Sequence, residues 1–406
     1  MLDVEKIREE FPILNTKMNG KPLVYLDSAA TSQKPRQVIE ALTDFYKTKN
    51  SNVARGLYAL AEEATHAYEE ARVKIQKFLG AKSEREIVLT NNTTTAENIL
   101  LWGWGNKFIQ KGDKIVTTVL EHHSNFVPWQ QLAKMKEAMF EIVDINEDCT
   151  LKAEDFEKIQ GAKLVVFTHV SNVAGTINSV RDICKMARET GAVSVVDGAQ
   201  SVPCMKVDVK TLGCDFLLFS GHKMLGPFGS GGFYGNEEVL AQMNPAFFGS
   251  EMIREVHADY STWNELPHRF EPGTPNVAEM IALGVAVDYM NKIGMDNIRR
   301  HEREITTYAL KRLQEIDGLK IIGPTNAEMR GGLVAFELKG VHPHDIAAFL
   351  GDAGIAVRSG HHCAMPLHVR LNIPSSTRAS FHVYTKKEEI DLLVNELNKV
   401  KTIFGG

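Results

Sequence analysis

Residues 193–223 read VSVVDGAQSVPCMKVDVKTLGCDFLLFSGHK, and this stretch contains two short apolar runs. The first run ends in Asp197, and Lys223 follows shortly after the second. Continuous apolar runs of this kind are typical of parallel strands that are covered on both faces. Their separation is about one βα unit, so we expect Asp197 and Lys223 at the ends of successive strands. Such ends face the crevice in which open α/β sheets bind ligands.

The same alternation extends through the central part of the chain. Further strands are predicted at 86–89, 114–118, 139–143, 163–168 and 232–234, besides 193–197 and 216–219. Helical patterns occupy 93–107, 128–138, 153–159 and 180–189. Strands that alternate with amphipathic helices predict an α/β fold with a mostly parallel sheet.

The pattern changes after about residue 267. Helical patterns at 278–293, 295–316, 343–353 and 387–403 surround strand candidates at 319–322, 332–338 and 355–358. A chain of 406 residues suits two domains. We therefore predict a large domain over 20–265 and a smaller α+β domain formed by 1–19 and 266–406. The N-terminal helix, 4–10, is expected to pack onto the smaller domain.

Composition argues against several classes of protein. The net charge of -5 gives no overall basic field that would favour nucleic acid. No apolar stretch approaches the ~18 residues of a membrane-spanning helix, and the first ten residues lack the apolar core of a signal peptide. We expect a cytoplasmic protein without a membrane or nucleic-acid partner. The five cysteines are widely spaced and form no C-x-x-C pair, so neither a zinc knuckle nor a redox dithiol is indicated.

Lys223 and its neighbours indicate a cofactor chemistry. A lysine amine at the end of a strand can form a Schiff base, and Ser220 and His222 beside it could hold a phosphate. Asp197 ends a buried strand and requires a cationic partner, which a protonated pyridine nitrogen would supply. Gln200 lies shortly after, where its amide could reach a ring hydroxyl. The alternatives are a surface lysine in a glycine-rich loop and an aspartate that caps a turn.

Two further polar loops follow predicted strands. Residues 91–95 read NNTTT and open a helix, so they indicate an anion site, simple N-capping, or both. Residues 121–125 read EHHSN, and a histidine there could stack on an aromatic ring. Adjacent histidines also suggest a metal. However, neighbouring side chains diverge and no further ligand has a fitting spacing, so we expect no metal site.

A third loop, at 358–366, reads RSGHHCAMP. Because it is polar, contains glycine and ends in proline, we expect Cys363 to be the most exposed cysteine. His361 and His362 could favour its thiolate, the reactive form. The alternative, a structural cysteine, suits the other four better. Arg378 opens an apolar-aromatic run, and its planar guanidinium suits either a substrate carboxylate or an ordinary surface salt bridge.

Together with YLDSAAT at 25–31, THVSN at 168–172 and GTPN at 273–276, these segments resemble the cysteine desulfurases over nearly the whole chain. The short histidine-bearing loop at 358–363 resembles the group II (SUF-type) branch rather than the longer loop of group I. The resemblance implies a fold-type I, aminotransferase class V-like architecture. It also implies the cofactor pyridoxal 5'-phosphate (PLP).

The resemblance implies a role for each matching residue. Lys223 resembles the lysine that holds PLP as a Schiff base, and Cys363 resembles the cysteine that forms a persulfide; His122 counts with them as catalytic. The implied contacts to PLP are His122 against the ring, Asp197 at the pyridine nitrogen, Gln200 at the ring hydroxyl, and Thr93, Thr94, Ser220 and His222 at the phosphate. Thr274 matches a phosphate contact from a second subunit, so a homodimer is implied. The implied substrate-binding residues are Asn172, Arg358 and Arg378.

The implied reaction converts L-cysteine to L-alanine and leaves the sulfur on Cys363 as a persulfide. A sulfur-acceptor protein of an iron-sulfur assembly system would then take that sulfur. Two alternatives stay open: a selenocysteine lyase or cysteine sulfinate desulfinase with the same cofactor, and a catalytically silent scaffold. A nicotinamide dehydrogenase is disfavoured because the first strong βα unit lacks the G-x-G-x-x-G turn.

The sequence departs from the group II pattern near Arg55 and Gly56. Ala54 stands where many members have a histidine, and Tyr58 and Ala59 stand where another histidine is frequent. These departures concern the fine structure of the substrate pocket. They leave the lysine, the aspartate and the cysteine untouched.

Overall fold

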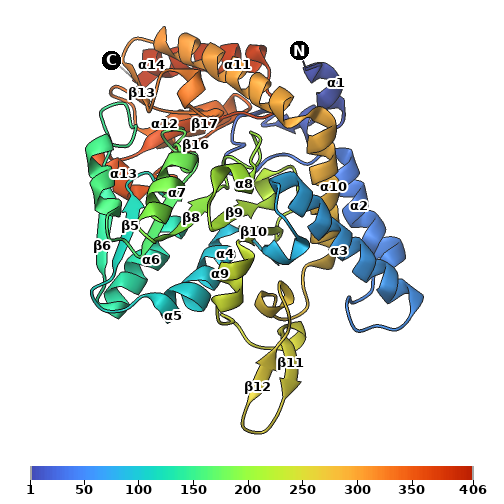
Figure 1. The fold of residues 1–406 in the computed structure, drawn as a ribbon. Coiled ribbons are helices and arrows are strands. Elements are labelled where there is room, and N and C mark those ends of the chain that lie inside the picture. Colours follow the sequence, from blue (N-terminus) through green and yellow to red (C-terminus); the bar gives the residue numbers. More distant parts are fainter. Residues whose placement is uncertain (1, 405–406) are drawn as a thin grey trace.

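The computed structural model describes residues 2–404, and its centre is a seven-stranded sheet of order β4-β10-β9-β8-β7-β5-β6 (Figure 1). Every strand runs in the same direction except β10, which is antiparallel to both its neighbours. The strands are β4 (Ile87–Thr90), β5 (Lys114–Thr118), β6 (Met139–Val143), β7 (Leu164–Thr168), β8 (Val193–Asp197), β9 (Phe216–Ser220) and β10 (Gly231–Gly235). The mostly parallel sheet is confirmed, and each predicted strand matches to within one residue at either end.

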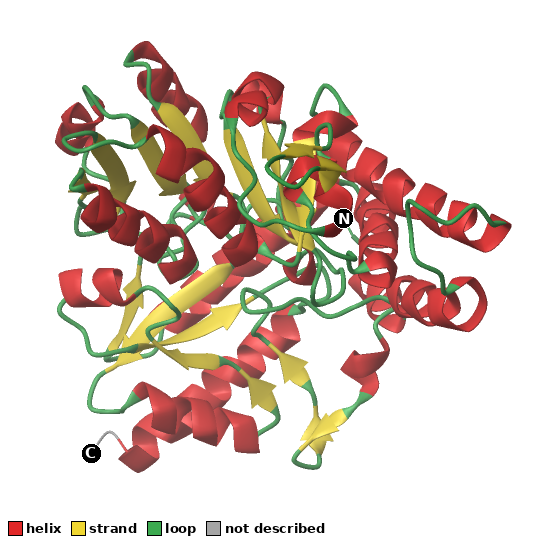
Figure 2. Cartoon of the chain, turned by 90° about the horizontal axis from the view of Figure 1, so that it is seen from below, coloured by secondary structure: helices red, strands yellow, loops and turns green. Residues whose placement is uncertain are grey.

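Strand β9 illustrates how this sheet is buried on both faces. Phe216 and Leu218 belong to one apolar core, and Leu217 and Phe219 belong to another, because successive side chains point to opposite faces. Figure 2 shows helices on both sides of the strands. Those on the first face are α4 (Thr93–Leu100) and α6 (His123–Lys136); those on the second are α3 (Ala59–Leu79), α7 (Val180–Glu189) and α10 (Val277–Ile293). Burying one such side chain stabilises the fold by ~1.5–3 kcal/mol, so the strand ends rest on a rigid support.

The helical predictions required several corrections. The single helix expected at 93–107 is α4, a π-helical turn (Leu101–Gly105) and α5 (Asn106–Phe108). A Cβ atom at Gly103 would lie 2.6 Å from the carbonyl oxygen of Asn244. The π-helical turn therefore packs against the Asn244 backbone too closely for any residue but glycine at this position. The helix start expected at Pro128 is wrong, because α6 begins at His123 and carries Pro128 in its interior. Residues 153–159 form a 3-10 helix, and the pattern did not assign α2 (Arg36–Asp44) or α3.

A second, four-stranded antiparallel sheet has the order β13-β14-β17-β16. Helices α11 (Met295–Gln314), α12 (Pro343–Asp352) and α14 (Lys387–Phe404) share its apolar core. Its strands are β13 (Leu319–Ile322), β14 (Leu333–Leu338), β16 (Arg358–Gly360) and β17 (Ser376–Ser380). The strand expected at 355–358 divides into β15 (Ile355–Ala356) and β16, which pair with different strands. Strand β17 was missed because its sequence STRAS is polar, although every residue in it is buried.

The N-terminal segment contacts the part of the chain that carries this second sheet. Helix α1 (Val4–Glu9) is held there by Arg8, which donates to the Tyr384 carbonyl and pairs with Glu389 at 2.9 Å. Strand β3 (Val24–Tyr25) pairs in parallel with β15. The division at residues 19/20 and 265/266 stays a prediction.

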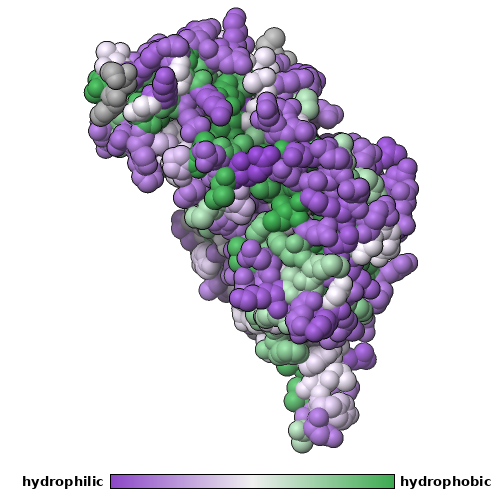
Figure 3. All heavy atoms as spheres, turned by 90° about the vertical axis from the view of Figure 1, so that its left-hand side faces the viewer, coloured by the Kyte–Doolittle hydropathy of each residue, from purple (hydrophilic) through white to green (hydrophobic). Residues whose placement is uncertain are grey.

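A hairpin of β11 (Ile253–Val256) and β12 (Ser261–Trp263) projects from the body at the bottom of Figure 1. In Figure 3 the molecule tapers toward this end, and its mostly hydrophilic surface is interrupted by apolar patches. Among residues 2–404, no helix combines the length and the hydropathy needed to cross a membrane.

Candidate active site

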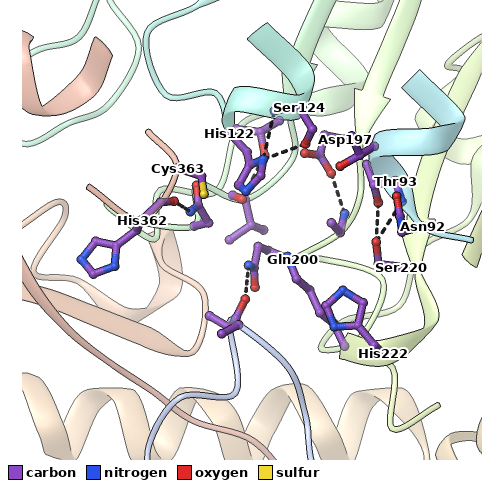
Figure 4. Close-up of a pocket in the computed structure, with 18 of the residues that line it drawn as sticks. Asn92, Thr93, His122, Ser124, Asp197, Gln200, Ser220, His222, His362 and Cys363 are labelled. Atoms are coloured by element: carbon purple, nitrogen blue, oxygen red, sulfur yellow. Dashed lines mark hydrogen bonds between the residues drawn. The ribbon is translucent and has the colours of Figure 1, made fainter. Parts of the chain in front are cut away.

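The carboxyl ends of the central strands open into a pocket of about 380 Å³. Figure 4 shows its polar side chains converging from several loops. Asp197 is the last residue of β8, and Lys223 follows the end of the neighbouring strand β9, as predicted from their spacing. The pocket is lined by every predicted site residue except Thr274: Thr93, Thr94, His122, Asn172, Asp197, Gln200, Ser220, His222, Lys223, Arg358, Cys363 and Arg378.

Burial controls the charge of the two residues at the base of the pocket. It lowers the pKa of Lys223 from 10.5 to about 8, against the attraction of Asp197. Burial also raises the pKa of Asp197, while the Ala199 N–H, which donates to it at 2.8 Å, and Lys223 act in the opposite direction. A carboxylate and an amine in such a site have charge states that respond strongly to any cation or anion bound between them.

Ser220 and the first turn of α4 form a cradle at one end of the pocket. The Thr93 N–H donates to Ser220 Oγ at 3.0 Å, and the two hydroxyl oxygens lie 2.7 Å apart. The Nδ1 atom of His222 is buried without a hydrogen-bond partner. Burial lowers the pKa of His222 to about 3, so the ring is neutral at physiological pH. Hydroxyls and a helix N-terminus in this arrangement suit a phosphate.

His122 lies over the same pocket as the N-cap of α6. Its Nδ1 atom accepts from the Ser124 N–H at 3.1 Å and lies 2.7 Å from Ser124 Oγ, which holds the ring in one orientation. Burial, and then the Lys223 charge, lower the pKa of His122 to about 3. Gln200 is fixed by its own amide, which donates to the Ala29 carbonyl at 2.9 Å.

Asp27 joins the two arginines that the sequence predicted to hold substrate. It accepts from Arg358 Nη2 at 3.0 Å and from Arg378 Nη2 at 3.2 Å. Arg378 is buried, donates also to the Asn172 carbonyl at 2.9 Å, and retains an unpartnered Nε. Asp27 lies within the motif at 25–31, and no role was predicted for it. Its partners are 331 and 351 residues away, and local sequence holds no signal for such pairs.

The loop of Cys363 is anchored although the thiol is exposed. The Cys363 carbonyl accepts from the His123 N–H at 2.6 Å, and His123 Nε2 accepts from the Met365 N–H at 2.9 Å. His362 and Cys363 both have left-handed backbone angles, with φ of 51° and 58°. Asn172 donates to the His362 carbonyl at 2.6 Å. These bonds hold a strained turn over the pocket. The prediction that Cys363 is the most exposed cysteine is confirmed.

Thr274 lies elsewhere. Its side chain is exposed, and it does not line the pocket of its own chain. The described residues, 2–404, contain no group of three or more histidine, cysteine, aspartate and glutamate side chains that could hold a metal ion.

The pocket fits PLP. The cradle at Thr93 and Ser220 suits a phosphate, and Asp197 suits the pyridine nitrogen. The buried polar atoms without partners include His222 Nδ1, Asn172 Oδ1 and Arg378 Nε, each on a residue that lines the pocket. Buried polar atoms are rarely left unpaired in native proteins, so their convergence indicates a polar ligand.

The family model described as aminotransferase class-V matches residues 24–393. A probable cysteine desulfurase from Halalkalibacterium halodurans is 50% identical over 406 residues, which cover 100% of this chain and 99% of the relative. A cysteine desulfurase from Haloferax volcanii is 44% identical and is matched over 99% of this chain and 98% of its own.

Two solved structures are similar in fold and in sequence. The apo cysteine desulfurase from Thermococcus onnurineus NA1 has a TM-score of 0.94 and 40% identity, with 98% of both chains covered. The cysteine desulfurase CsdA from Escherichia coli has a TM-score of 0.92 and 33% identity, with 100% of both chains covered.

Proposed function

The chain belongs to the aminotransferase class-V family, and from this premise we propose that it is a PLP-dependent cysteine desulfurase. It converts L-cysteine to L-alanine and retains the sulfur as a persulfide on Cys363. The observation that carries this proposal is a pocket that is lined by a half-buried lysine, a buried aspartate and an exposed cysteine. A site of this composition can supply both a proton acceptor and a sulfur nucleophile.

We assign the cofactor contacts to residues on three sides of the pocket. Thr93, Thr94, Ser220 and His222 would hold the phosphate, Asp197 would keep a proton on the pyridine nitrogen, and His122 and Gln200 would contact the ring. When bound, PLP supplies an electron sink that makes loss of a Cα proton accessible. The neutral His122 ring suits this stacking position because it adds no charge of its own.

Lys223 moves the proton. At pH 7 roughly a tenth of its amine is uncharged, because burial has lowered its pKa to about 8. Nζ of the free amine accepts the proton from the substrate Cα and returns it later in the same turnover. A general base works best when its pKa lies near the working pH, and this one does.

Arg378 and Asn172 hold the substrate. The unpartnered Nε of Arg378 donates to the substrate carboxylate, while Asp27 and the Asn172 carbonyl keep the guanidinium in place. Arg358 is more exposed and shares Asp27, so it contributes from the outer part of the pocket. Both arginines thus act as an orienting pair that is held by one carboxylate.

Cys363 takes the sulfur. Its thiolate attacks the substrate sulfur, so the S–S bond forms as the Cβ–S bond breaks. The electron pair of the broken bond remains with the substrate fragment, which is protonated at Cβ and leaves as alanine. Cys363 then carries a persulfide at the exposed rim, within reach of an acceptor thiol.

We extend the proposal to the setting of the enzyme. The compact loop at Cys363 supports a group II (SUF-type) desulfurase that hands sulfur to an acceptor protein of an iron-sulfur assembly system. Phe228 lines the pocket yet is 66% exposed, and Thr274 is exposed as well, which supports a homodimer in which the second subunit covers the phosphate end. Five free thiols support the reducing environment of the cytoplasm.

The test is turnover by the purified protein reconstituted with PLP. We expect alanine and thiol-releasable sulfur in equal amounts from L-cysteine, together with a cofactor absorption band that shifts on adding substrate. Parallel assays with selenocysteine and cysteine sulfinate rank the substrates. Turnover of either of these, but not of cysteine, would redirect the assignment. A protein that binds no PLP would contradict the proposed desulfurase activity and favour the alternative of a catalytically silent scaffold.

A further inference from the structure

A small second cavity adjoins the active-site pocket. The two cavities share Ala29, Val170, Gln200 and Lys223 in their walls. The small cavity has a volume of about 20 Å³, which exceeds the ~10–15 Å³ that one water molecule requires. Its other polar walls are Ser28, Cys204, Glu302 and His382.

His382 presents a hydrogen-bond donor to this cavity. Its Nδ1 atom accepts from the Val383 N–H at 2.9 Å. Burial lowers the pKa of His382 to about 3, so the ring is neutral. A neutral imidazole that accepts at Nδ1 carries its proton on Nε2.

The Nε2 donor has no acceptor among the described residues. The Lys223 backbone lies near enough to raise the pKa of the ring, but the two groups form no hydrogen bond of normal geometry. An unpaired buried donor is destabilising unless a water molecule accepts its proton.

Glu302 offers acceptors in the wall of the same cavity. Oε1 accepts from the Gly332 N–H at 2.9 Å, and Oε2 accepts from Arg299 Nη1 at 2.7 Å. The Cys204 thiol also hydrogen-bonds to this carboxyl group. Two carboxylate oxygens have about four acceptor positions, so this group has capacity for one more donor. The cavity is therefore lined by a donor from His382, by acceptors from Glu302 and by the Lys223 side chain.

We propose that this cavity binds one water molecule, which accepts from His382 Nε2–H and donates to Glu302 and to the Lys223 amine. His382 is thereby a positioning residue that orients Lys223 through the water. A base that must take a proton from a fixed carbon depends on the direction of its lone pair, and a small misplacement is costly. The inference rests on the proposed function in taking Lys223 as the reactive lysine.

The test compares His382→Asn with His382→Gln in the holoenzyme. An asparagine oxygen can replace Nδ1 as the acceptor for the Val383 N–H but does not reach the Nε2 position. A glutamine amide reaches that position and restores a donor. His301→Asn is the control for packing around His382, because His301 is also buried, bonds the Thr385 carbonyl through Nε2, interacts with the His382 backbone, and does not line the cavity.

Crystal structures should show the water within hydrogen-bond distance of His382 Nε2 in the wild type and in His301→Asn. The water should lie near the glutamine amide in His382→Gln and should be absent in His382→Asn. We expect His382→Asn to lower kcat roughly 10- to 100-fold with little change in KM, and His382→Gln to recover most of the loss. The cofactor absorption band should persist in all variants.

The absence of water density in the wild type would overturn the inference, as would wild-type kcat in His382→Asn. Equal losses in all variants, His301→Asn included, would assign the effect to packing and would also overturn it. The water density is independent of desulfurase activity. An inactive protein with the water in place would therefore refute the proposed function and leave the water site standing.

Discussion

The floor and the rim of the pocket are built in opposite ways. The floor, defined as the buried Asp197 and the half-buried Lys223, lies at the ends of neighbouring strands, where the pKa of each residue is displaced from its ordinary value. The rim, defined as residues 361–364, carries an exposed thiol on a turn with left-handed backbone angles, tied to α6 by hydrogen bonds. Burial thus sets the pKa values of Asp197 and Lys223, whereas the Cys363 thiol, which must react with a partner, is exposed.

The largest effect is expected at the floor. Lys223→Ala should lower alanine formation at least ~1,000-fold, because no other amine lines the pocket among the described residues. The measurement is alanine release under saturating L-cysteine, together with the cofactor absorption band, which should change in position. If the variant turned over at a tenth of the wild-type rate or better, Lys223 would not be the residue that transfers the proton.

The rim should separate sulfur transfer from proton transfer. Cys363→Ser should lower sulfur release from L-cysteine about 100-fold or more, since a hydroxyl is a far weaker nucleophile toward sulfur than a thiolate. The absorption change on adding cysteine should survive, because the floor is intact. Unchanged sulfur release would mean that the exposed cysteine is not the acceptor and that the comparison of floor and rim is mistaken.

The smallest effect concerns acid stability. The ordinary pKa of His122 is 6.5, and burial lowers it to about 3 in the folded chain. Between these values the unfolded chain binds a proton that the folded chain excludes. The free energy of unfolding should therefore fall as pH falls from 6.5, by up to about 1.4 kcal/mol per pH unit for such a histidine.

Urea unfolding of the cofactor-free protein between pH 6.5 and 4 measures this slope. His122→Phe should reduce it. Phe126→Leu, at a buried position of the same helix that does not titrate, should shift stability equally at every pH. An unchanged slope in His122→Phe would show that His122 is protonated in the folded protein, and that burial of the pocket wall does not control its charge.

Sequence patterns predicted most of what local interactions determine. Strands β8 and β9 were predicted because continuous apolar runs are typical of parallel strands that are covered on both faces. Their spacing correctly predicted that Asp197 and Lys223 lie at the ends of neighbouring strands. The exposure of Cys363 followed from its polar loop. Strand β17 was missed because its polar side chains are satisfied by distant partners, such as the bond from Arg378 to Asp27.

By itself, the sequence of this protein determined the apolar periodicity, the loop chemistry at the strand ends and the resemblance that these motifs carry. Those features arise from residues close together along the chain. Only the tertiary structure decided that Asp27 holds both arginines and that His382 faces a cavity behind Lys223. Each of these contacts joins residues more than 150 positions apart, and such pairings are selected by packing of the whole chain rather than by any local preference.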